Sequence, residues 1–198
     1  SHTNLGKYAF RNTNITGVTL YRTMFSIPEG LFEGTKLTTI EIKSNLMGGT
    51  IGANAFKNCT ELVSVKAPGV RCNATSIGNS AFEGCSKLTT FEPVLTSALT
   101  SIGDNAFKGT GITAIQFLDN YISQALTIGE SAFEGTKLTS ISLPARVSVL
   151  GQSAFRYCDD LEKIELLGDS QAGELSIGYQ AFQKTNGVTK TYDFVCDR

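Results

Sequence analysis

The sequence contains one histidine, His2, and no tryptophan among its 198 residues. A lone histidine next to the N-terminal residue excludes the usual Ser-His-Asp and Cys-His arrangements within a rigid fold. No G-x-x-x-x-G-K-[ST] or G-x-G-x-x-G motif follows an expected strand, and no acidic cluster has the spacing of a calcium loop. We therefore predict a protein that is not an enzyme and that uses no cofactor or metal.

A surplus of charge and a long apolar run are also missing. The chain has 17 basic and 18 acidic residues, so nothing favours nucleic acid or an anionic membrane as a partner. No apolar stretch approaches the ~18 residues that suggest a membrane-spanning helix. The repetitive part begins at Leu5 without a preceding signal peptide, so we expect any leader and anchor to lie outside this sequence.

What the sequence does contain is one short phrase, repeated eight times: an Ile or Leu, usually followed by Gly, and an aromatic residue five positions later. The anchoring aromatic residues are 22 to 27 positions apart: Phe10, Phe32, Phe56, Phe82, Phe107, Phe133, Phe155 and Phe182. Such a period is typical of a solenoid, because one unit cannot bury its own apolar face. We predict a single elongated domain over residues 1–198, with an irregular C-terminal cap over 186–198.

A second pattern, L-x-x-I-x-L, follows the anchors, as in Leu37, Ile40 and Ile42. Its final part alternates with period two and predicts one short strand per repeat in a parallel sheet. The G-x-x-A-F part is too short for an independent α-helix, so we expect short helical or 3₁₀ turns opposite the sheet. The predicted fold class is an α/β solenoid of about eight repeats of 22 to 27 residues.

Two further positions recur in the repeats. The residue after the anchor alternates in sign, which predicts a ladder of charges that fixes the stacking register: Arg11, Glu33, Lys57, Glu83, Lys108, Glu134 and Arg156. The third residue after the anchor is Cys59, Cys85 or Cys158 in some repeats and Thr in the others, which predicts a small buried site. We expect the Thr residues to hydrogen-bond to neighbouring backbone. Cys72 and Cys196 lie outside the motif and are expected to be surface thiols or a distant pair.

The frame L-x-x-L-x-L-x-x-N, complete at Ile112, Ile115, Phe117 and Asn120, is similar to the leucine-rich repeat. The companion phrase I-G-x-x-A-F-x-x-C/T-x-x-L resembles the BspA-type subclass, which occurs in surface proteins of bacteria and some protozoan parasites. The resemblance covers about nine tenths of the chain. It implies a right-handed leucine-rich repeat superhelix, an extracellular or cell-surface location, and adhesion to host matrix proteins or other cells.

The outward side chains of the expected strands are mostly small or polar. Because interface hot spots favour Trp, Tyr and Arg, we expect a monomeric, weak or avidity-dependent binder of a protein partner. Insertions in repeats gather along one flank, where Tyr121 and Arg71 are the first candidate anchors. The candidate contacts on the strands themselves are Glu41, Lys66, Glu92 and Gln116. Two alternatives stay open, a structural spacer domain of a larger surface protein and a glycan-binding surface protein; the scarcity of aromatic residues disfavours the second.

Overall fold

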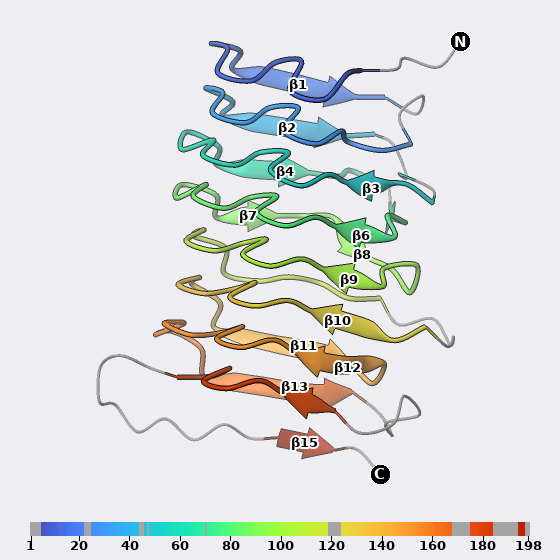
Figure 1. Ribbon diagram of the computed structural model, residues 1–198, viewed down its shortest axis with the longest axis vertical. Coiled ribbons are helices and arrows are strands. Elements are labelled where there is room, and N and C mark those ends of the chain that lie inside the picture. The colour runs from blue at the N-terminus through green and yellow to red at the C-terminus, as the bar shows by residue number, and fades with distance from the viewer. Residues whose placement is uncertain are drawn as a thin grey trace.

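The computed structural model describes residues 5–21, 25–43, 46, 48–69, 71–118, 124–167, 175–183 and 194–196. In these ranges the chain is a parallel β-solenoid whose successive repeats lie side by side in one stack. Strand β1 (Gly17–Leu20) lies at one end of the stack and β15 (Phe194–Cys196) at the other (Figure 1). We name each repeat by its anchoring phenylalanine.

The L-x-x-I-x-L segments form two parallel sheets that follow each other along the stack. The first contains β1, β2 (Thr39–Ile42), β4 (Ser64–Lys66) and β7 (Thr90–Phe91), and the second contains β11 (Ser140–Pro144), β13 (Lys163–Leu167) and β15. The predicted alternation is confirmed in β2, where Ile40 and Ile42 are buried and Glu41 is not. We call the two sheets together the split sheet and their outward side the split face.

In six of the eight phrases, the opening Ile or Leu lies in a strand of its own, and Ile27 forms an isolated bridge to Ile51. Six such strands form one continuous parallel sheet, the regular sheet: β3 (Thr50–Ile51), β6 (Ser76–Ile77), β9 (Ser101–Ile102), β10 (Leu126–Ile128), β12 (Val147–Leu150) and β14 (Ser176–Ile177). The prediction of one strand per repeat is therefore wrong. A Ser, Thr or Val directly before the apolar residue is the sequence feature that these strands share.

The G-x-x-A-F segments are turns, and the part of the chain that the structure describes contains no helix. The residues two positions before and after the anchor have positive φ, as at Asn54 (56°) and Asn58 (58°) around Phe56. This left-handed backbone interrupts the i→i−4 bonding of an α-helix. The N–H groups bond to the next repeat instead, and Phe56 N donates to Ala81 O at 2.8 Å. The expected helical turns, and with them the α/β class, are not confirmed. Membrane-spanning apolar helices are accordingly absent from the described ranges.

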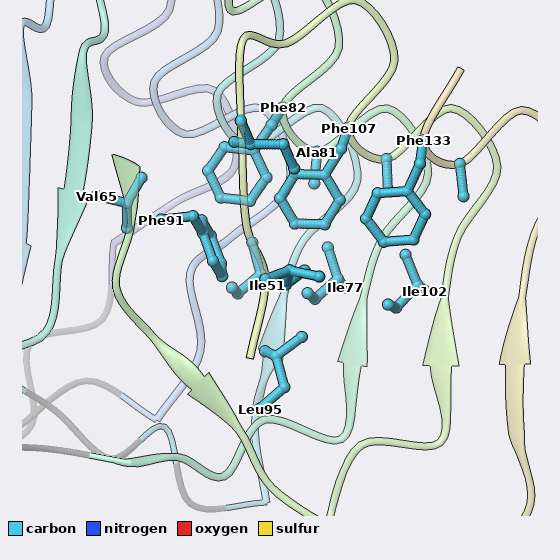
Figure 2. Packing of buried hydrophobic residues seen from close by; sticks show 14 of the residues in the cluster. Ile51, Val65, Ile77, Ala81, Phe82, Phe91, Leu95, Ile102, Phe107 and Phe133 are labelled. Carbon is cyan, nitrogen blue, oxygen red and sulfur yellow. The ribbon is translucent and has the colours of Figure 1, made fainter. Parts of the chain in front are cut away.

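The anchoring phenylalanines form one column of stacked rings through the core. Neighbouring ring centroids are 4.9–5.6 Å apart, and their planes are within 20° of parallel. Figure 2 shows Phe82 and Phe107 side by side, with Ile77 of the regular sheet and Phe91 of β7 both next to these rings. The Phe91 ring meets both rings edge-on, at centroid distances of 5.6 and 5.2 Å. The column thus joins the regular sheet to the split sheet.

The third residue after the anchor occupies the predicted buried site. Cys59, Cys85 and Cys158 are fully buried, free thiols. Cysteine and threonine use different acceptors at this site, as Cys85 and Thr110 show. The Thr110 hydroxyl donates to the carbonyl of Phe107 in its own turn at 2.8 Å, whereas the Cys85 thiol donates to the Phe56 carbonyl of the preceding repeat at 3.0 Å. The expected bond from Thr to neighbouring backbone is confirmed at Thr110.

Cys72 does not behave as predicted. It is 3% exposed and has a free thiol, because strand β5 (Arg71–Cys72) turns Arg71 outward and Cys72 toward the core. Burial raises the pKa of the Cys72 thiol. The interpretation as a surface thiol or as one half of a distant disulfide is therefore wrong. The side chain of Cys196 lies outside the described part of the structure.

The charges that follow the anchors pair between adjacent repeats, as the alternation of sign predicts. The nitrogen–oxygen distances are 3.1, 2.9 and 3.2 Å for the pairs Arg11–Glu33, Lys57–Glu83 and Lys108–Glu134. Exposed pairs contribute only about 0–1 kcal/mol each. Their consequence is specificity of stacking, because a slip of one repeat would bring like charges together.

Candidate functional site

The split sheet is interrupted at the Phe107 repeat, and Pro93 lies at the start of the interruption. When the L-x-x-I-x-L patterns of the two repeats are aligned, Pro93 stands opposite Phe117. In the structure, Leu95 forms the parallel β-bridge with Phe117 instead. Proline has no N–H to donate to a ladder. Leu95 N donates instead to Gln116 O at 2.9 Å, and Leu118 N donates to Leu95 O at 2.7 Å. The pairing is therefore displaced by two residues from the frame, and β7 ends at Phe91.

The displaced segment belongs to a small sheet on the flank of the stack. Strand β5 pairs in parallel with β8 (Val94–Leu95), with Arg71 opposite Val94. Residues 116–118 follow on the other side of β8 through the bridge from Leu95 to Phe117. Segments that the sequence indicated as loop insertions thus contain strands. Arg71 is exposed, as predicted, at the outer side of this flank sheet.

On its other side, the Phe107 repeat meets β11 without a ladder. In the Phe82 repeat, the N–H of Glu92 donates to the carbonyl of Val65 in the preceding repeat at 2.9 Å. The equivalent bond would run from Ser142 N to Ile115 O. Among the described residues, no backbone hydrogen bond joins 114–118 to β11. The N–H of Ser142 consequently faces a gap between two repeats.

A second proline stands at the far side of this gap. Lys43 N donates to Leu20 O of the preceding repeat at 2.7 Å. Pro144 occupies the position of Lys43 in the Phe133 repeat, and it has no N–H to donate. Pro93 and Pro144 therefore remove ladder donors on both sides of residues 114–118, which explains why the split sheet is broken there while the regular sheet continues.

The break forms a groove of about 520 Å³, within the ~300–1,000 Å³ typical of ligand pockets. Its walls are Arg71 and Val94 of the flank sheet, the segment 114–118, and residues 140–142 of β11. Arg71 is the one charged residue among the described residues that line it. The rest of the lining consists of apolar residues and three uncharged polar ones, Gln116, Ser140 and Ser142.

Some of the predicted contact residues lie on the split face and some line the groove, and Gln116 does both. Glu41, Lys66, Glu92 and Gln116 follow one another across the split face in successive repeats, and Glu41 pairs in register with Lys66. Glu41 forms an ion pair with Lys43 at 3.3 Å, and Glu92 accepts a hydrogen bond from the backbone of Ala67 at 3.1 Å. Gln116 and Arg71 line the groove together. Tyr121 lies outside the described residues.

Val94 and the serines of β11 line the groove but were not among the predicted contacts. The signal that could have found them is a proline in the strand frame, because such a proline belongs at an edge or a break. Pro93 replaces the apolar residue that other repeats carry at this position, such as Ile42 and Leu143.

The chemistry of this region is that of binding through hydrogen bonds. The Ser142 hydroxyl donates to Glu165 at 2.6 Å. The Lys163 ammonium and then this hydroxyl lower the pKa of the Glu165 carboxyl, so Glu165 stays ionised at neutral pH and is held in place. Within the described residues, no group of three or more His, Cys, Asp and Glu side chains is placed to hold a metal ion.

Two solved structures are similar to this chain. A leucine-rich repeat protein from Bacteroides ovatus is 23% identical, with a TM-score of 0.66, over 96% of this chain and 45% of its own. A leucine rich cell surface protein from Faecalibacterium prausnitzii is 26% identical, with a TM-score of 0.48, over 77% of this chain and 48% of its own. The chain thus spans less than half the length of either protein. No curated protein matches it significantly.

The sequence also matches the model of the BspA type leucine rich repeat region, over residues 3–126 and 75–193. The two matched ranges together cover nearly the whole chain. The model finds six copies, so the count of eight repeats is not confirmed and stays a prediction. The stacked anchors and the two ladders of parallel strands agree with this match. The chain belongs to the BspA-type family of leucine-rich repeat proteins.

Proposed function

We propose that this chain is a non-catalytic, protein-binding module displayed at a cell surface, and that it adheres through its split face. The observation that carries the proposal is the break at 114–118, which opens a groove and, among the described residues, leaves the Ser142 N–H without a backbone bond to the Phe107 repeat. Such groups bind water or another molecule. The BspA-type family supports the surface location, since the resemblance implies extracellular display.

The partner in this proposal is a protein of the host matrix or of another cell, bound by a monomer of this chain. The contacts are Glu41, Lys66, Glu92 and Gln116 on the strands and Arg71 at the groove, together with Tyr121, which lies outside the described residues. Few of these side chains are aromatic, so each contact contributes little. Affinity then depends on many copies acting together on one cell.

The rest of the fold supports such a use because it is rigid. The column of phenylalanine rings and the regular sheet hold each repeat against the next. A surface that is already ordered loses little conformational entropy when a partner binds. Side chains on successive strands are therefore presented at fixed spacing.

The test compares two variants of equal size on cells or beads that display many copies. The first replaces the strand contacts by alanine: Glu41, Lys66, Glu92 and Gln116. The control replaces four exposed residues of the turns between the anchors and the strands: Ser86, Lys87, Lys137 and Asp160. We expect the first variant to lose retention on immobilised matrix proteins or on other cells and the control to keep it. Equal retention by both variants would contradict the proposed face.

A structural spacer is the second candidate, favoured by the unbroken stack of rings from Phe10 to Phe182. A spacer needs length and stiffness but no specific surface. It would tolerate both alanine variants and would lose function only when whole repeats are deleted. If both alanine variants still bind to a glycan array, the result would indicate the glycan-binding alternative.

A further inference from the structure

We infer that the groove at the break recognises an extended, acidic segment of the partner protein. This inference rests on the proposed function and specifies the chemistry of the partner at one place on the split face. It commits to an extended peptide with a carboxylate, because the described part of the groove combines one cation, a backbone N–H without a bond to the neighbouring repeat, and a lining of apolar and uncharged polar side chains.

The charge of the groove selects an anionic group. Arg71 is exposed at one end of it, and no carboxylate is among the described residues that line it. The described part of the structure shows no ion pair for Arg71, whereas Lys43 and Lys163 form ion pairs with Glu41 and Glu165. A guanidinium binds a carboxylate through two parallel hydrogen bonds. The amide of Gln116 and the hydroxyl of Ser140 add donors along the same groove.

The dimensions of the groove fit an extended chain. It runs from Arg71 in the Phe56 repeat, past Val94 and Gln116, to Ser140 in the Phe133 repeat. Adjacent strands are about 4.8 Å apart, so three intervals span about 14 Å. An extended peptide rises about 3.4 Å per residue, and about four residues would fill this length. A peptide in this position lies across the strands, along the axis of the stack.

The backbone of the break supplies partners for such a peptide. Ser142 N–H lacks the bond that its equivalent, Glu92 N–H, makes to the preceding repeat. A main-chain carbonyl of a segment that crosses the strands here can accept from this single N–H, because a backbone donor without a partner in the fold bonds to another molecule. Val94, Phe117 and Leu118 belong to the apolar part of the lining, which suits an aliphatic side chain beside the acidic one.

The experiment is an NMR titration of the ¹⁵N-labelled chain with three probes. The first is a blocked hexapeptide of alternating valine and aspartate, the second has asparagine in place of aspartate, and the third is succinate. We expect the aspartate peptide to shift the amide signals of Val94, Gln116 and Ser142. The substitution Arg71→Gln should weaken this binding about tenfold, the change expected for one charged hydrogen-bonded pair. Lys36→Gln, at an exposed lysine outside the groove, should leave it unchanged.

Several results would overturn the inference. Equal binding of the asparagine peptide, or unchanged binding by Arg71→Gln, would remove the acidic requirement. Shifts from succinate as large as those from the peptide would show that the groove takes a bare carboxylate and not an extended segment. Shifts confined to residues outside the groove, or no shifts, would also refute it.

These outcomes are separable from a failure of the proposed function. If the strand variant loses retention on a matrix protein while the groove binds no acidic peptide, the split face is a binding face and only the groove assignment is wrong. If the aspartate peptide binds at Arg71 but no matrix protein or cell is retained, the groove assignment stands and the adhesive function falls.

Discussion

The regular sheet and the split sheet are built by the same chain, repeat after repeat, but only one of them is continuous. The regular sheet joins six strands, from β3 to β14, in parallel register. The split sheet stops at β7 and begins again at β11, with the groove between them. Both sheets pack on the same column of phenylalanine rings, so the interruption on one side does not interrupt the stack (Figure 1).

This difference shows which part of the repeat maintains the fold and which part is free to vary. On the regular side, neighbouring repeats approach so closely at six phrase glycines that no other residue fits there without a shift: Gly52, Gly78, Gly103, Gly129, Gly151 and Gly178. On the split side, Pro93 and Pro144 replace residues that would extend a ladder. A solenoid whose stacking is secured along one side can present irregular backbone on the other.

The largest expected effect comes from the core that both sheets share. Phe107 is fully buried between Phe82 and Phe133, at 5.1 and 5.3 Å. We expect Phe107→Ala to lower the free energy of unfolding by about 3–5 kcal/mol. Phe117, at the break, is only half-buried, and Phe117→Ala should cost less than half as much. Urea denaturation followed by circular dichroism measures both, and equal losses would contradict the distinction between the two sides.

The next effect concerns the close approach of backbones on the regular side. A methyl group on Gly78 would lie 2.4 Å from the backbone nitrogen of Ala53, whereas one on Gly6 would meet nothing within 4 Å. We expect Gly78→Ala to lower the free energy of unfolding by about 1–3 kcal/mol, as overpacking does. Gly6→Ala is the matched control in the first repeat and should change it by less than about 0.5 kcal/mol. Urea denaturation measures both variants. Similar urea midpoints would show that neighbouring repeats can move apart at Gly78 without loss of stability.

Much of the scaffold was accessible from the sequence because it repeats. The eight anchors, the inward Ile40 and Ile42 and the buried Cys85 site all follow from spacing and alternation, and each is found as predicted. Solenoid order multiplies a weak local signal by the number of copies. The strands of the regular sheet were missed because a Ser-Ile or Thr-Ile pair is too short to indicate a strand by itself.

The candidate site was less predictable, because it depends on where the repetition fails. The sequence indicates Arg71 as part of a loop insertion and Gln116 as an outward residue of a strand. Only the displaced pairing of Leu95 with Phe117 brings both residues to one groove. The helical turns were predicted from length alone, without regard to the positive φ that Asn54 and Asn58 adopt. Backbone conformation of this kind is decided by bonds to the next repeat, which no single repeat contains.

The third effect tests the break directly through amide hydrogen exchange. Glu92 N–H is bonded to Val65 O at 2.9 Å, while the equivalent Ser142 N–H has no such bond to the Phe107 repeat. The loss of one backbone hydrogen bond, about 1 kcal/mol or more, predicts exchange at Ser142 that is about tenfold faster than at Glu92. ¹⁵N-resolved exchange under native conditions measures both sites. Equal protection would mean that the ladder continues through the Phe107 repeat and that the groove has no unpaired edge.

The smallest effect concerns the charges that follow the anchors, which pair at Arg11–Glu33, Lys57–Glu83 and Lys108–Glu134. Glu83 pairs with Lys57 at 2.9 Å, and both side chains are about one-third exposed. The substitution Glu83→Lys replaces this attraction with repulsion, from Lys57 on one side and the Lys108 repeat on the other. We expect a loss of at most about 1 kcal/mol that shrinks as salt is added, because exposed charges are screened. Glu162→Lys, at an exposed residue outside the ladder, controls for the change in net charge. A loss that does not depend on salt would mean that Glu83 acts through packing, and the ladder would then not be what selects the stacking register.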